Sequence, residues 1–91
     1  MADEIIDAVR ENDSGGVCHC YHIAYRVEDN GDTNHFVVVV MASDMTDPND
    51  EIEAKTLANT EAAAKKAAWV TAKATANANV PESSLIGTVT L

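Results

Sequence analysis

The sequence predicts a small α+β domain of order (α)ββαβ, in which a three-stranded, mainly antiparallel sheet carries one long alanine-rich helix packed on one face. Three observations support it: a β-hairpin pattern over residues 17–42, a helical pattern that begins near Pro48, and an alternating apolar segment at residues 84–91. A chain of 91 residues forms one domain with a limited core. We expect residues 1–16 to form a short N-terminal helix and a flexible joint, and residues 17–91 to form a single ββαβ domain.

The N-terminal segment, residues 2–12, has the pattern of a short amphipathic helix. Ile5, Ile6 and Val9 lie on one side of this helix and charged residues surround them. Three apolar side chains cannot stabilise an isolated helix, so it must either dock on the rest of the chain or fray. The sequence N-D-S-G-G at residues 12–16 is typical of a flexible joint.

Residues 17–42 contain two apolar runs, V-C-H-C-Y-H-I-A-Y-R-V and H-F-V-V-V-V-M-A, joined through E-D-N-G-D-T. Asn30 and Gly31 supply the two positive-φ residues of a tight type I′ turn. This turn sets the register, which places four pairs opposite each other: Asp29 and Asp32, Tyr25 and Phe36, Ile23 and Val38, and Tyr21 and Val40. The opposite face of the hairpin is only half polar.

A strand that reads V-V-V-V is apolar on both sides, which usually means that both sides are covered. One helix covers one face of the sheet. The other face needs a second cover, to which the N-terminal helix contributes a small part and a second copy or another protein the rest. The predicted interface residues are therefore Val37, Val39, Met41, Trp69, Ile5, Ile6 and Val9.

The segment A-S-D-M-T-D-P-N-D-E predicts a helix start, with Asp47 as N-cap and Pro48 as the first helical residue. The helix is expected to run to about Thr75 and to stop before Pro81. Its expected core stripe contains Ile52, Thr56, Ala63, Ala67, Val70 and Ala74, widened by Leu57, Thr60, Ala64 and Ala68.

Trp69 lies away from this stripe, near Ala58, Ala62 and Ala76, with lysines on either side. Two interpretations are open. The tryptophan either packs on its own helix under lysine stems, with a cation–π contact, or anchors an interface.

The C-terminal segment S-L-I-G-T-V-T-L alternates in the manner of a strand. We expect it to pair with the first strand of the hairpin, so that the sheet order is 2-1-3.

The composition is acidic, with 15 Asp and Glu against 6 Lys and Arg and a net charge of −9. Such a surface repels phosphate backbones, which disfavours direct nucleic-acid binding. No apolar run approaches the roughly 20 residues that cross a bilayer, and the N-terminus lacks a signal-peptide pattern. We expect no membrane association and a cytoplasmic location.

The cluster Cys18-His19-Cys20-x-His22, with His35 across the hairpin, suggests a metal site. However, Cys18, Cys20 and His22 span about 13 Å along one strand, too far to bind one zinc together, and Val39 and Met41 opposite offer no suitable ligand. Ordinary buried, reduced cysteines are favoured. No pocket, oxyanion donor or orienting group accompanies a Cys-His pair, so we expect no enzyme, no cofactor and no metal.

The layout resembles that of short acidic proteins encoded by tailed bacteriophages. The resemblance covers residues 17–91: the hairpin Y-R-V-E-D-N-G-D-T-N-H-F-V-V-V-V, the helix E-A-A-A-K-K-A-A-W-V-T-A-K-A-T-A and the terminal segment S-L-I-G-T-V-T-L. It implies a virion-associated or assembly component, located in the host cytoplasm or the virion, or an accessory protein that acts on a host protein. It carries over no functional residue.

Three hypotheses follow for the function. The first is a structural or assembly protein that forms a homo-oligomer or docks on another protein through the apolar sheet face. The second is an acidic inhibitor whose carboxylates imitate nucleic-acid phosphates. The third is a metal-dependent module, which the zinc content of the purified protein would decide.

Overall fold

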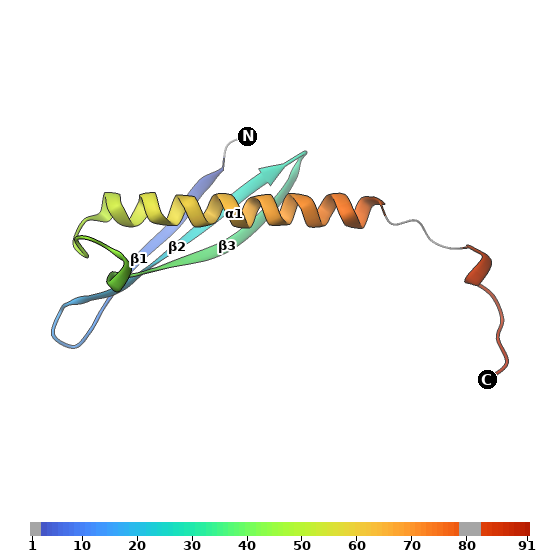
Figure 1. Ribbon diagram of the computed structural model, residues 1–91, viewed down its shortest axis with the longest axis horizontal. Coiled ribbons are helices and arrows are strands. Elements are labelled where there is room, and N and C mark those ends of the chain that lie inside the picture. Colours follow the sequence, from blue (N-terminus) through green and yellow to red (C-terminus); the bar gives the residue numbers. More distant parts are fainter. Residues whose placement is uncertain (1–2, 79–82) are drawn as a thin grey trace.

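The computed structural model describes residues 3–78 and 83–91 and confirms the α+β class (Figure 1). Its sheet has three antiparallel strands in the order β1-β2-β3: β1 (Glu4–Asn12), β2 (Cys18–Asp29) and β3 (Asp32–Met41). The helix α1 (Glu51–Ala78) follows the strands and crosses one face of the sheet. Two short 3-10 turns are η1 (Ala42–Asp44) and η2 (Ser83–Leu85).

The central hairpin is confirmed in both its turn and its register. Asn30 and Gly31 have φ angles of 50° and 81°, so the turn uses the left-handed region where Asn and Gly are best tolerated. The four predicted cross-strand pairs are all present, and Tyr25 stacks on Phe36 with ring centroids 5.7 Å apart. The local turn chemistry was therefore sufficient to set the pairing of β2 with β3.

The helix predicted for residues 2–12 is wrong, because residues 4–12 form β1 along the edge of β2. A helix with three apolar residues buries little, whereas a strand satisfies the backbone groups at that edge. The segment expected to be a flexible joint is an ordered hairpin loop, in which the Asp13 carboxylate accepts hydrogen bonds from the backbone N–H groups of Gly15 (2.8 Å) and Val17 (3.0 Å). Residues 4–12 thus belong to the same sheet as the hairpin and do not form a separate helix.

The strand predicted for residues 84–91 is also wrong. After η2 the chain has irregular backbone, and Figure 1 shows this segment beyond the end of α1, away from the sheet. The C-terminal segment was expected to pair with the first strand of the hairpin, which is β2. That edge of β2 is occupied by β1 instead, so the sheet order is β1-β2-β3. The predicted helix stop before Pro81 lies outside the described residues.

The helix begins three residues later than predicted, and Asp47 is not its N-cap. The Asp50 carboxylate caps the helix by accepting hydrogen bonds from the backbone N–H groups of Ile52 (3.0 Å) and Glu53 (3.2 Å). The Glu53 carboxylate in turn accepts from the N–H groups of Thr46 and Asp47, both at 2.8 Å. These bonds fold residues 46–50 into a compact entry to the helix.

The side of α1 that faces the sheet differs from the predicted stripe. Ala54, Ala58 and Ala62 are buried, whereas Ile52 of the predicted stripe is 71% exposed. Trp69 packs against the same core, and the Lys73 ammonium lies 4.4 Å from the centroid of its ring. The expected cation–π contact of Trp69 with a lysine is present, but the ring packs against the core between α1 and the sheet and not on its own helix alone. The core contains Cys18, Tyr21, Ile23, Tyr25, Val27, Val38, Val40, Met45, Ala54, Ala58 and Ala62.

Candidate functional site

The face of the sheet opposite α1, here called the outer face, bears several of the predicted interface residues. On β3, Val37 is 53% and Val39 43% exposed, and Met41 is half-buried. The register places Ala24 and Val9 on the same face, because Ala24 pairs with Val37, and Val9 pairs with His22, which in turn pairs with Val39. None of the elements in residues 3–78 packs on it in the way that α1 packs on the other face.

Charged side chains border this apolar strip along β1. Arg26 Nε lies 3.2 Å from Glu4 Oε1 across the β1–β2 pair, and Asp7 and Glu11 are exposed farther along the strand. The outer face thus has an apolar strip on the β3 side and a mostly acidic edge on the β1 side.

The remaining predicted interface residues are spread over other places. Ile5 lies on the helix side, paired with Tyr25, and Ile6 sits at a β-bulge between Ile5 and Asp7. Because the predicted N-terminal helix is a strand, Ile5, Ile6 and Val9 do not form one lid, although each is at least 36% exposed. Trp69 is half-buried on the far side of the sheet.

A groove runs between β1 and α1, because the helix packs on β2 and β3 and leaves β1 beside it. Ile5, Ala8 and Lys55 line it, with Arg10 and Ile52 at one end. At the other end an ion pair crosses it: Lys66 Nζ lies 2.8 Å from Asp3 Oδ2. The hydrogen-bonded Lys66 ammonium lowers the pKa of the Asp3 carboxyl. The Glu28 backbone N–H, which donates a hydrogen bond to the same carboxylate, lowers it further.

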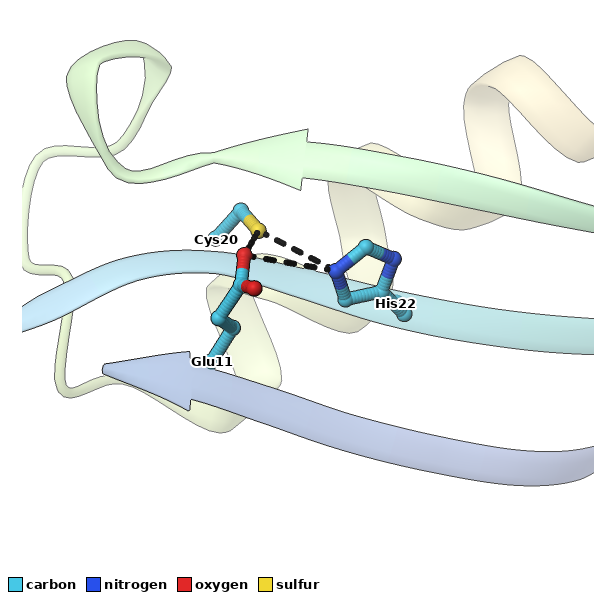
Figure 2. A group of neighbouring side chains, drawn as sticks. All are labelled: Glu11, Cys20 and His22. Atoms are coloured by element: carbon cyan, nitrogen blue, oxygen red, sulfur yellow. Dashed lines mark hydrogen bonds and ion pairs between the residues drawn. The ribbon is translucent and has the colours of Figure 1, made fainter. Parts of the chain in front are cut away.

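A cluster of three potential ligands lies on the outer face near the β1–β2 loop (Figure 2). The Cys20 thiol donates a hydrogen bond to Glu11 Oε2 at 3.0 Å and contacts His22 Nε2 at 3.4 Å. His22 Nε2 lies 3.6 Å from the same carboxylate oxygen. Cys20 is 2% exposed, whereas the Glu11 and His22 side chains are open to solvent.

The electrostatics of this cluster favour a protonated thiol beside an ionised carboxylate. The hydrogen bond to Glu11 is the larger cause and burial is the next, and together they raise the pKa of the Cys20 thiol to about 11. The hydrogen bonds from Cys20 and His22 lower the pKa of the Glu11 carboxyl. A thiol held in this state is a poor nucleophile, so the arrangement does not suit covalent catalysis.

The sequence interpretation considered Cys18, Cys20 and His22 and missed Glu11. The structure separates Cys18, which is a free thiol buried in the core cluster, from Cys20 and His22. Glu11 comes from β1, which pairs it directly with Cys20. The signal that could have placed it is the N-D-S-G-G sequence, since a hairpin loop there brings residues 4–12 alongside β2.

The C-terminal segment, residues 84–91, carries four exposed apolar side chains. All of them are at least 66% exposed: Leu85, Ile86, Val89 and Leu91. The segment contains no charged side chain, in a protein whose net charge is −9.

Comparison of the chain with protein-family models, with curated proteins and with solved structures found no match. No helix within residues 3–78 and 83–91 combines the length and the hydropathy needed to cross a membrane.

Proposed function

We propose that the protein is a non-enzymatic structural or assembly protein that self-associates, with a second copy covering the outer face. One observation carries the proposal: apolar side chains that are exposed or half-buried gather in the strip formed by Val37, Val39 and Met41 and in the C-terminal segment 84–91. With the resemblance to small acidic proteins of tailed bacteriophages, this role is that of a virion or assembly component, located in the host cytoplasm or the virion.

The two surfaces are alike in carrying apolar side chains and no charge. Residues 36–41 of β3 read F-V-V-V-V-M, and residues 84–91 read S-L-I-G-T-V-T-L, so neither carries a charged side chain. β3 is an edge strand, whose free backbone groups can accept another strand. The segment 84–91 has a strand pattern and lies away from its own sheet (Figure 1). The segment of one copy therefore adds to the β3 edge of another, where the side chains on one side of the added strand lie beside Val37 and Val39 and contribute to covering the outer face.

The energetics favour mutual exchange between two copies over a single contact. Burying the four apolar residues of the segment contributes roughly 6–12 kcal/mol, at about 1.5–3 kcal/mol each. Association costs about 4–15 kcal/mol in lost freedom of motion. When two copies exchange their segments, the burial gain and the cost of ordering the segments both double, while the loss of translational and rotational freedom is incurred once.

Light scattering across a range of protein and salt concentrations tests this proposal. The wild-type protein is expected to be an oligomer that salt does not dissociate, because the contact is apolar. Val37→Asp on the outer face and Val89→Asp in the segment should each give monomers that retain the wild-type circular dichroism spectrum. Ala67→Asp, which adds the same charge at an exposed position of α1, is the matched control.

Two results would contradict self-association: a wild-type protein that is monomeric at every concentration, or an oligomer that both aspartate variants leave intact. In the first case the net charge of −9 favours the alternative function, an acidic inhibitor of a nucleic-acid-binding protein. A complex with a basic protein that dissociates as salt is raised would support that alternative.

A further inference from the structure

The side chains of Glu11, Cys20 and His22 converge on one point from two strands (Figure 2). They offer one sulfur, one imidazole nitrogen and one carboxylate oxygen, and each is a ligand that zinc accepts. Thiolate and imidazole together favour zinc and related transition metals over Mg²⁺ and Ca²⁺, which prefer sites made only of oxygen atoms.

The distances between the three atoms fit one tetrahedral ion. Zinc bonds of about 2.0–2.3 Å at tetrahedral angles place neighbouring ligand atoms roughly 3.4–3.6 Å apart. The separations here are 3.4 Å between Cys20 Sγ and His22 Nε2, 3.6 Å between His22 Nε2 and Glu11 Oε2, and 3.0 Å between Cys20 Sγ and Glu11 Oε2. A small opening of the last pair, through the exposed Glu11 side chain, completes the fit.

We infer that Glu11, Cys20 and His22 form a binding site for one Zn²⁺ ion on the outer face of the sheet. The ion replaces the thiol proton of Cys20, which leaves to solvent, and the sulfur then binds as thiolate. The exposure of Glu11 and His22 gives the ion a path of entry and leaves a fourth position for water. The bound ion links the edge strand β1 to β2 near their connecting loop.

All three ligands belong to one chain, so the site does not need a second copy, although it shares the outer face with the self-association proposed above. Val39 pairs directly with His22, so a change at that residue would disturb both features. Val89→Asp lies far from the cluster in the sequence and separates the two questions: zinc should bind this variant as it binds the wild type, whether or not the variant is monomeric.

Metal titration of the reduced, untagged, chelator-treated full-length protein tests the inference. Zn²⁺ followed by calorimetry should bind at one ion per chain, and Co²⁺ as a spectroscopic probe should give the charge-transfer absorption of a thiolate ligand. Removal of a residue that only orients a metal ligand weakens metal binding about 10–100-fold, so loss of the ligand itself in Cys20→Ser should weaken Zn²⁺ binding at least ~100-fold. Cys18→Ser, at the other free thiol, and His35→Asn are the matched controls.

Glu11→Gln keeps the experiment decisive if Cys20→Ser fails to fold, because Glu11 is exposed and the substitution preserves its size. It should weaken Zn²⁺ binding at least ~10-fold and leave the metal-free circular dichroism spectrum unchanged. The inference is overturned if the wild type does not bind Zn²⁺, if Co²⁺ gives no thiolate absorption, or if Cys18→Ser weakens binding as much as Cys20→Ser.

Discussion

The two faces of the sheet are made from alternate residues of the same strands, yet only one of them is covered. On the helix side Val38 is 1% exposed, and on the outer side its neighbour Val39 is 43% exposed. Both belong to one uninterrupted apolar run. An apolar strand pattern therefore indicates which surfaces are hydrophobic. Whether such a surface is covered depends on the other elements of the chain, and here α1 covers one face only.

The cover itself is thin. The buried residues of α1 that contact the sheet are small, Ala54, Ala58 and Ala62, so the helix axis lies close to β2 and β3. Ile52 and Leu57 of the same helix lie outside this contact, and Trp69 is the large residue of α1 that packs against the core. Packing on this side depends on close approach of the two backbones and not on interlocking of large side chains. The positions of Ile52 and Leu57 had indicated another side of the helix.

The largest expected effect is the contrast between the neighbouring valines. Val38→Ala removes buried methyl groups and leaves a cavity, so it should lower the free energy of unfolding by about 2–3 kcal/mol. Val39→Ala should change it by less than about 0.5 kcal/mol. Urea denaturation at low protein concentration measures both. Equal losses would mean that the outer face is buried even in the dilute protein.

A smaller effect is expected on the helix. Ala58 is 0% exposed, and Ala58→Leu forces extra volume between α1 and the sheet, which should lower the unfolding free energy by about 1–3 kcal/mol. Ala67→Leu, at an exposed position within the predicted stripe, should be nearly neutral. Thermal denaturation of the pair decides which side of α1 covers the sheet, and the reverse ranking would restore the stripe that the sequence suggested.

The smallest effect concerns acid. Hydrogen bonds from the backbone of Asp47 and Thr46 lower the pKa of Glu53 below its usual 4.5. A lowered pKa in the folded state adds stability that is present above about pH 4.5 and is lost as the pH falls through the folded value. The urea concentration at the unfolding midpoint should therefore fall when the pH is lowered from about 5 to about 3. This fall should be smaller in Glu53→Gln. Glu61→Gln is the control, and equal acid sensitivity in all three proteins would contradict this role of Glu53.

The elements with local determinants were predictable from the sequence. Asn30 and Gly31 determine the central turn by their own conformational preferences, so the register followed. The helix also followed, to within a few residues at its start. The N-terminal strand did not, because Ile5, Ile6 and Val9 fit a helical side and a pleated strand equally well, and only the neighbouring edge of β2 decides between them.

The same ambiguity explains why the three-ligand cluster was missed. Cys20 and His22 lie two residues apart and are visible in the sequence, but Glu11 reaches them only through the pairing of β1 with β2. In α1, alanine appears on every side of the helix, so the sequence contains little contrast to show which side packs. The predicted stripe relied on the few large residues, such as Ile52, which is exposed.

A smooth alanine surface has no interlocking side chains to stop a helix from sliding or rolling on its sheet, and polar contacts at intervals supply that positional control here. Tyr21 donates to the Pro48 carbonyl at 2.8 Å before the helix begins, and Tyr25 donates to Asn59 Oδ1 at 2.7 Å in its first half. Lys73 holds the distal end, with Nζ 2.9 Å from carboxylate oxygens of Asp29 and Asp32 beside the hairpin turn. The apolar contact therefore stabilises the packing of α1 on the sheet, and these hydrogen bonds and ion pairs fix its position along and around the helix axis.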